Sequence, residues 1–182
     1  ILKAYNSIKS NFGAAKADFF RYLVIYAKGG VYIDIKSGPV KNIDRLLKEA
    51  KNNILVSYEK ESMNSFWYFN FPKGEMLQWA VMAPKGHPVV RELIEQCLSN
   101  IENDYSDKKN YIGGRSVIFM TGPMMFTNVI KNSKHEKIKY LKPNMDGYFS
   151  KYLTNYDKEK LSNLGTVDYH HQTDNVITEH LN

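Results

Sequence analysis

The sequence lacks the features that would cross-link a chain covalently or take it through a membrane as a helix. Its 182 residues include a single cysteine, Cys97, which excludes a disulfide framework and a cysteine-rich zinc site. No run approaches the roughly 18 consecutive apolar residues that a transmembrane helix requires. No repeat of about 20–50 residues recurs, which excludes a solenoid or a propeller.

The composition is that of one folded domain. Apolar residues make up 43% of the chain and aromatic residues 13%, which excludes an intrinsically disordered protein. A length of 182 residues is close to that of a single domain, and no linker of biased composition divides the sequence. We therefore expect one domain over residues 1–182.

Basic residues outnumber acidic residues by 25 to 19, which gives a net charge of +6. This excess favours an anionic partner such as a nucleic acid, a membrane surface or a phosphorylated small molecule. A nucleic-acid site also needs arginines and stacking aromatic side chains, and the densest basic stretch has only Tyr140. We interpret this stretch as a solvated face and expect no nucleic-acid partner. Its lysines are Lys131, Lys134, Lys137, Lys139 and Lys142.

The segment from residue 14 to residue 36 combines a helix, a glycine stop and a strand. Apolar side chains recur in residues 14–28 at spacings of three and four, which predicts a helix. Gly29 and Gly30 end this helix, because glycine readily adopts the left-handed conformation found there. Residues 31–35 are mostly β-branched or aromatic and predict a buried strand with Asp34 at its carboxyl end. The expected buried face of the helix contains Phe19, Leu23, Tyr26 and Ala27.

The rest of the chain alternates between helical and extended patterns, which indicates an α/β sheet. Further helices are expected at 43–51, at 75–83, from Pro88 to about residue 103, and from Gly122-Pro123 to Ile130. Further strands are expected at 53–58, 66–71 and 167–170, and residues 116–120 fit either a short strand or the start of a helix.

Three charged residues of the first segment are candidates for a ligand site. Ligands of α/β proteins bind at the carboxyl ends of strands, where Asp34 is expected. Asp18 and Arg21 lie one turn apart on the preceding helix. A guanidinium binds phosphate through its fork of donors and a carboxylate accepts from sugar hydroxyls, so the three residues suit a sugar phosphate. The alternative is that Asp18 and Arg21 form only a surface ion pair, worth roughly a few tenths of a kcal/mol.

This segment resembles the sugar-binding region of glycosyltransferase family 32, which carries a DXD motif. The residues that match are Ala15, Asp18, Arg21, Tyr22, Gly29, Gly30, Tyr32, Asp34 and Lys36. Three later blocks are also similar to the family, namely residues 78–83 with Gly86-His87-Pro88, Thr121-Gly122-Pro123, and His170-His171. The family includes yeast-type α-1,6-mannosyltransferases and bacterial capsule and lipopolysaccharide glycosyltransferases. The resemblance implies a GT-A-like α/β fold, which is the nucleotide-diphospho-sugar transferase fold.

The resemblance also implies an activity: transfer of a hexosyl unit from a UDP- or GDP-sugar to a hydroxyl of a saccharide or glycan, with retention of the anomeric configuration. Asp18 and Arg21 would hold the donor sugar and its diphosphate. Tyr32 would border the donor, and Asp34 would contact sugar or ribose hydroxyls. On this basis Asp34→Ala and Arg21→Ala would each abolish transfer and leave the fold intact.

Three residues of the later blocks are candidates for the acceptor side of the site. They are Gln78, Trp79 and Thr121. Trp79 is equally a candidate core residue. Thr121 is equally a candidate helix cap, because threonine accepts hydrogen bonds from the first amides of a helix. His87, directly before Pro88, is interpreted as a neighbour of a helix N-cap.

The sequence departs from the family pattern at the second acid of the motif. This acid would ligate the Mn²⁺ or Mg²⁺ ion that bridges the donor diphosphate, and here it is replaced by Lys36. Either the Lys36 ammonium takes over the charge of the cation, or Asp34 holds a metal together with His170 or His171, or the protein has lost catalysis. The last alternative describes a non-catalytic protein that binds a saccharide or a nucleotide-sugar.

A second departure concerns the N-terminus. Members of the family begin with a strand–helix–strand portion that cradles the nucleotide, whereas 13 residues precede the first expected helix here. Either that portion lies outside this chain, which does not begin with Met, or the natural protein is short. The compartment stays open: the cytoplasm or the membrane periphery for a bacterial or viral protein, and the Golgi lumen for a eukaryotic one.

Overall fold

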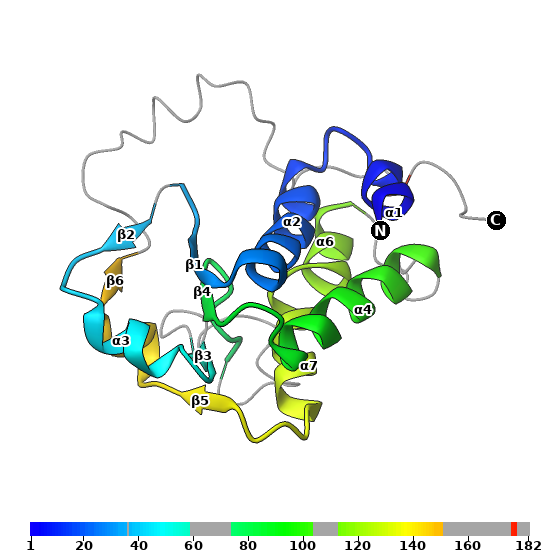
Figure 1. The fold of residues 1–182 in the computed structure, drawn as a ribbon. Helices are drawn as coiled ribbons and strands as arrows, with labels where there is room; N and C mark the ends of the chain where they lie inside the picture. The colour runs from blue at the N-terminus through cyan, green and yellow to red at the C-terminus, as the bar shows by residue number, and fades with distance from the viewer. Residues whose placement is uncertain (36, 59–73, 104–112, 151–175, 178–182) are drawn as a thin grey trace, which may run out of the picture.

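The computed structural model describes residues 1–35, 37–58, 74–103, 113–150 and 176–177, and Figure 1 shows how their elements are arranged. In chain order these are α1 (Leu2–Ser7), α2 (Gly13–Lys28), β1 (Gly30–Ile33), β2 (Gly38–Pro39), α3 (Asp44–Glu49), β3 (Ile54–Val56), β4 (Ala80–Ala83), α4 (Pro88–Glu102), α6 (Gly114–Met120), α7 (Pro123–Asn132), β5 (Ile138–Tyr140), α8 (Pro143–Gly147) and β6 (Phe149–Ser150).

Four strands form the central sheet in the order β1-β4-β3-β5. β4 runs antiparallel to both neighbours, with Ala80 opposite Ile33 of β1 and Met82 opposite Leu55 of β3. β3 and β5 run parallel to each other. β2 and β6 form a separate antiparallel pair. The described chain is therefore a mixed α/β structure, in agreement with the fold class expected from the sequence.

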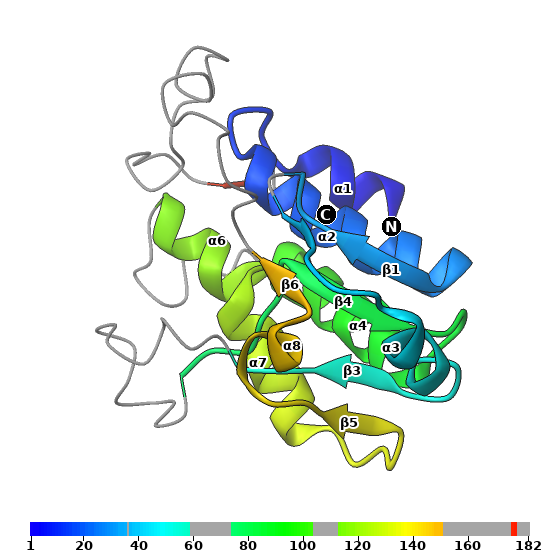
Figure 2. The same ribbon diagram turned by 90° about the vertical axis from the view of Figure 1, so that its left-hand side faces the viewer.

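Helices cover both faces of the central sheet (Figures 1 and 2). On one face, α2, α4, α6 and α7 enclose a larger core that includes Phe19, Leu93 and Phe126. On the other face, α3 and α8 enclose a smaller core. Val81 belongs to the larger core and Met82 to the smaller one, because successive residues of a strand point to opposite faces of the sheet.

The buried face of α2 differs from the expected one. Leu23 and Tyr26 are only half-buried and Ala27 is exposed. The residues of α2 that are buried are Ala15, Asp18, Phe19, Arg21, Tyr22 and Ile25. The face turned to the protein interior thus includes a carboxylate and a guanidinium, which a search for apolar periodicity passes over. This rotation of the helix excludes the interpretation of Asp18 and Arg21 as a solvent-exposed surface pair.

Two expectations for the strands are corrected by the structure. The helix expected over 75–83 is wrong, because residues 75–79 are not helical and Ala80–Ala83 form β4. All four residues are buried, because β4 lies between β1 and β3 and both of its faces are covered by a core. A short apolar run of this kind shows no periodicity that would distinguish a strand from a helix. The strand expected at 31–35 ends at Ile33 and is half-buried rather than buried, since β1 lies at an edge of the described sheet.

The other expectations agree with the structure to within a few residues where it is described. Helices α3, α4 and α7 and strand β3 lie close to their expected positions, and α6 resolves residues 116–120 as a helix. Helix α1 was not expected. The strands expected at 66–71 and 167–170 lie outside the described residues. All five lysines of the basic stretch are exposed, as expected for a solvated face.

Gly122, at the junction between α6 and α7, provides a test of this packing. A Cβ atom there would lie 2.8 Å from the Ile118 Cα and 2.8 Å from the Val117 carbonyl oxygen, both in the backbone of α6. We expect Gly122→Ala to lower the free energy of unfolding by about 1–3 kcal/mol. Gly13→Ala is the matched control, because its Cβ meets nothing within 4 Å and alanine favours the helix by about 0.4–1 kcal/mol. Urea denaturation measures both, and equal effects would contradict the close approach.

Candidate functional site

The junction between α2 and β1 brings the three candidate charged residues together. Gly29 follows α2 with a φ of 69°, and a Cβ atom on it would lie 2.5 Å from the backbone nitrogen of Lys85. Only glycine fits this close approach, so the chain can turn directly from the helix into β1. Asp34 then follows the last residue of β1, and its backbone nitrogen donates to the Trp79 carbonyl over 2.9 Å. The carboxyl end of β1 therefore faces the middle of α2.

Arg21 lies at the centre of the resulting cluster. Its Nη2 is 3.0 Å from Asp18 Oδ1 and 3.0 Å from Asp34 Oδ1, and its Nη1 donates to the Gln78 carbonyl over 2.9 Å. The guanidinium also lies 5.0 Å from the centroid of the Tyr32 ring, within the range of a cation–π contact. The side chains of Arg21 and Asp18 are 5% and 10% exposed, whereas that of Asp34 is 30% exposed. Asp34 is thus the carboxylate of the cluster that a ligand reaches most easily.

Burial and charge act in opposite directions on the protonation of the cluster. Burial raises the pKa of Asp18 to about 7, although Arg21 opposes the shift. Burial alone would lower the pKa of Arg21, but the two carboxylates outweigh it and raise that pKa, so the guanidinium keeps its charge. Burial also raises the pKa of Tyr32, which therefore stays neutral at pH 7. The nearby Asp34 carboxylate adds to the effect of burial, so Asp18 titrates near neutral pH.

A second layer of polar side chains supports Asp18 from behind. Thr121 Oγ1 donates to Asp18 Oδ2 over 3.2 Å. The carbonyl oxygen of Thr121 accepts from Gln78 Nε2 over 2.8 Å and from the Tyr22 hydroxyl over 3.2 Å, and Gln78 Nε2 also contacts the Tyr22 hydroxyl. Tyr22 itself stacks on Phe126, with ring centroids 6.1 Å apart. Sequence reasoning counted Tyr22 in the motif but gave it no role, because its partners come from distant segments.

The structure separates the other candidates. Trp79 points into the smaller core and is 7% exposed, so its core alternative is the one observed, and only its backbone carbonyl reaches the cluster. His87 is itself the N-cap of α4, with Nδ1 accepting from the backbone nitrogen of Val89. Lys36, His170 and His171 lie outside the described residues, so their expected roles remain predictions.

Within the described ranges, no group of three or more histidine, cysteine or acidic side chains is arranged to hold a metal ion. The Asp18–Asp34 pair offers two carboxylates, but Arg21 already pairs with an oxygen of each. Of the residues expected to hold a metal, Asp34 alone is described, and a single carboxylate does not make a site for a hard cation. The described residues therefore fit a metal only if His170, His171 or the donor supplies the remaining ligands.

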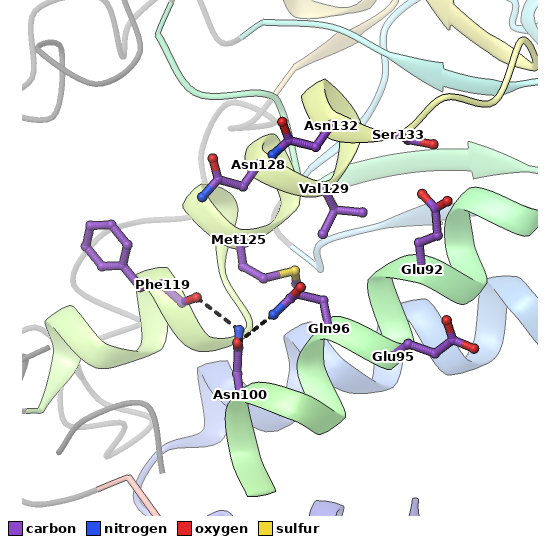
Figure 3. A pocket seen from close by; sticks show the side chains of 10 residues that line it. All are labelled: Glu92, Glu95, Gln96, Asn100, Phe119, Met125, Asn128, Val129, Asn132 and Ser133. Atoms are coloured by element: carbon purple, nitrogen blue, oxygen red, sulfur yellow. Dashed lines mark hydrogen bonds between the residues drawn. The ribbon is translucent and has the colours of Figure 1, made fainter. Parts of the chain in front are cut away.

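The described residues also form a groove of about 570 Å³ between α4 and α7, shown in Figure 3. Its lining includes Glu92, Glu95, Asn128 and Asn132, and it shares no residue with the Asp18–Arg21–Asp34 cluster. This groove is therefore separate from the site that the sequence predicts. Among the described helices, none is both long and apolar enough to cross a membrane.

Comparison with known proteins places this cluster in a recognised region. Residues 1–55 match the family described as a glycosyltransferase sugar-binding region containing a DXD motif, and this range contains Asp18, Arg21, Tyr32, Asp34 and Lys36. The expected resemblance to glycosyltransferase family 32 is thus confirmed: residues 1–55 match the DXD-containing region, and the similar relatives below fit the same family.

Similar relatives are found among fungal enzymes. The initiation-specific alpha-1,6-mannosyltransferase of Schizosaccharomyces pombe is 36% identical over 120 residues, which cover 63% of this chain and 30% of that protein. The protein of the same name from Candida albicans is 29% identical over 144 residues, which cover 71% and 37%. A solved structure of the PaToxG glycosyltransferase aligns with 66% of this chain and 36% of its own, at 22% identity and a TM-score of 0.46. The chain spans about a third of the length of these two curated relatives.

The burial of Arg21 revises the expectation that Arg21→Ala leaves the fold intact. This substitution would leave Asp18 buried without its counter-ion, which we expect to lower the free energy of unfolding by about 3–5 kcal/mol. Asp34→Asn is the matched variant in the same cluster, and we expect it to change this free energy by less than about 1 kcal/mol because Asp34 is partly exposed. Urea denaturation at pH 7.5 compares the two. Equal losses would mean that Arg21 does not stabilise the fold through Asp18.

The raised pKa of Asp18 predicts how stability depends on pH. The folded state holds a proton on Asp18 up to a pKa of about 7, whereas the unfolded chain releases it near 3.8. The stabilisation that this proton provides is therefore complete below about pH 4 and is lost as the pH rises to 7. In Asp18→Asn, which cannot titrate, the free energy of unfolding should rise relative to the wild type over this range. Urea denaturation of both proteins at pH 4.5, 6 and 7.5 measures the difference, and a difference that stays constant or falls would show that the pKa is not raised.

Proposed function

We propose that this chain is part of a glycosyltransferase that moves a hexosyl unit from a UDP- or GDP-sugar to a hydroxyl of a saccharide or glycan. The observation that carries the proposal is the Asp18–Arg21–Asp34 cluster at the carboxyl end of β1, inside the matched sugar-binding region. The two fungal relatives are named as mannosyltransferases, so mannose is the first hexose to test.

The geometry supports recognition of the sugar end of the donor. Asp34 is 30% exposed and uses Oδ1 for its ion pair, so the carboxylate retains acceptor capacity for sugar hydroxyls. Arg21 is buried and already holds Asp18, Asp34 and the Gln78 carbonyl. We therefore assign Arg21 the task of holding both carboxylates in place rather than gripping the diphosphate. Retention of configuration by front-face substitution would need only such positioning together with charge stabilisation.

The finer description of the fold belongs to the same proposal. In a GT-A-like arrangement, the strand–helix–strand portion that cradles the nucleotide would add to the sheet beside β1. β1 forms one edge of the described sheet and is half-buried, and such an edge offers backbone groups to a further strand. The match to about a third of the fungal relatives is in keeping with a nucleotide portion that lies outside residues 1–182.

For the charge of the leaving group, we propose that Lys36 acts in place of a metal ion. A divalent cation, when bound, would neutralise the diphosphate as it leaves. Asp34 is the described residue that would ligate it, with His170 or His171 as the remaining expected ligands. Because Arg21 already pairs with Asp34, the described residues favour the alternative in which the ammonium group stabilises the diphosphate directly.

A panel of donors tests the proposal. The thermal unfolding of the chain is followed with UDP- and GDP-sugars, each with Mn²⁺, with Mg²⁺ or with EDTA, and with UDP and GDP as controls that lack the sugar. A donor at 100 times its dissociation constant should add about 2.7 kcal/mol to the free energy of unfolding, which raises the melting temperature. We expect one donor to act in EDTA and Asp34→Asn to lose the gain over the nucleotide control. If none of the donors raises the melting temperature, that result would contradict a donor site within residues 1–182.

The second candidate function is a non-catalytic protein that binds a saccharide or a nucleotide-sugar, and Lys36 at the position of the second acid favours it. Both candidates predict binding, so release of product separates them. A transferase should liberate free sugar slowly from its donor even without an acceptor, because water replaces the acceptor hydroxyl. Chromatography monitors the free sugar over a day. Donor binding without any release of free sugar would favour the non-catalytic binding protein.

A further inference from the structure

Thr121 lies beside the carboxylate cluster, at the junction between α6 and α7. It follows the last residue of α6 and precedes Gly122, the N-cap of α7, and it is fully buried. Its side chain caps neither helix. Instead, the hydroxyl donates to Asp18 Oδ2 over 3.2 Å, so the helix-cap interpretation of Thr121 is not the one observed.

The backbone around Thr121 is held from two sides. On the side of the sheet, its carbonyl oxygen accepts from Gln78 and from Tyr22. On the side of α4, Asn100 Nδ2 donates to the Met120 carbonyl over 2.8 Å and to the Phe119 carbonyl over 3.3 Å. Figure 3 shows Asn100 bridging from α4 to the end of α6, with Gln96 bonded to its amide oxygen. These bonds hold the backbone of residues 119–121 in place and thereby fix the direction from which the Thr121 hydroxyl approaches Asp18.

The hydroxyl completes the hold on Asp18. Arg21 binds Oδ1 of this carboxylate and Thr121 binds Oδ2, so both oxygens are tied and the plane of the carboxylate is defined. Because Arg21 Nη2 pairs with Asp18 and Asp34 together, a tilt of Asp18 would move the guanidinium and, with it, the partly exposed carboxylate of Asp34. A buried side chain fixed at both oxygens therefore sets the geometry of the one that a ligand reaches.

We propose that Thr121 is a positioning residue of this site, which acts through Asp18 and Arg21 to orient Asp34 for the donor. The orientation of Asp34 toward a donor rests on the function proposed above, whereas the hold on Asp18 is independent of it. Two measurements address the two parts separately.

The first measurement is a double-mutant cycle on stability, which needs no ligand. The cycle is measured at pH 8, where Asp18, with a pKa of about 7, is mostly ionised. Thr121→Val removes the hydroxyl at nearly constant volume, and a hydrogen bond to a charged group corresponds to about a tenfold change in the folding equilibrium constant. In an Asp18→Ala background, where the acceptor is absent, the same substitution should cost less than about threefold. The matched control is Thr127→Val, another fully buried threonine, whose hydroxyl bonds Pro123 and Met76 instead. Its cost should be the same in both backgrounds. An equal cost of Thr121→Val in both backgrounds would overturn the proposal.

The second measurement is the affinity for the donor found in the panel, with kcat and KM where turnover is seen. Thr121→Val should weaken donor binding about tenfold, and Thr121→Ser, which keeps the hydroxyl, should restore it to within about threefold of the wild type. Thr127→Val should leave it unchanged. Failure of serine to restore binding, or an equal loss in Thr127→Val, would overturn the positioning role. If the wild type binds no donor, the proposed donor site within residues 1–182 fails, and the stability cycle still decides whether Thr121 acts on Asp18.

Discussion

The burial of one permanent positive charge is the constraint on which the rest of the site depends. The Arg21 side chain is 5% exposed, and a guanidinium does not lose its proton in a protein. The surroundings must therefore supply acceptors, and they come from three separate segments: Asp18 from the same helix, Asp34 from the end of β1 and the Gln78 carbonyl from the approach to β4. A single buried cation thus fixes the position of α2 on the sheet and brings two carboxylates to the carboxyl end of a strand.

The polar layer behind the cluster follows from the same requirement. A buried carboxylate beside a buried cation is tolerated only when its remaining lone pairs are satisfied, and Thr121 meets that need for Asp18. Thr121 is in turn fixed by Tyr22, Gln78 and the last turn of α6. Gly122 allows α7 to begin directly afterwards, because the backbone of α6 leaves no room for a Cβ atom. The junction between two helices is therefore part of the site, although it lies about 100 residues after Asp18 in the sequence.

The local part of this arrangement could be predicted from the sequence, and the long-range part could not. The helical period, the glycine stop and the strand place Asp18, Arg21 and Asp34 near one another within one short segment. The resemblance named Gln78 and Thr121 as well, but their partners lie 43 to 103 residues away and no local pattern specifies them. The strand at residues 80–83 was missed for a related reason, since a strand buried on both faces shows no alternation. The sequence does not decide whether the Trp79 side chain lies at the cluster or in the core, because successive residues of an extended chain point to opposite sides.

On the proposed function, the charge of the cluster bears on which end of the donor it would receive. Two carboxylates and one guanidinium leave one negative charge in excess when Asp18 is ionised. Burial is the main cause of the raised pKa of Asp18, and the Asp34 carboxylate adds to it. A diphosphate is itself anionic and would be repelled, whereas the hydroxyls of a sugar are neutral hydrogen-bond donors that carboxylates accept. The cluster therefore suits the sugar, and the diphosphate requires a positive charge from elsewhere. Lys36 lies two residues beyond Asp34 in the sequence and carries such a charge without any ligand, while a metal ion would need donors that the described residues do not provide. On this electrostatic ground, a lysine in place of the second acid is compatible with catalysis and does not by itself indicate its loss.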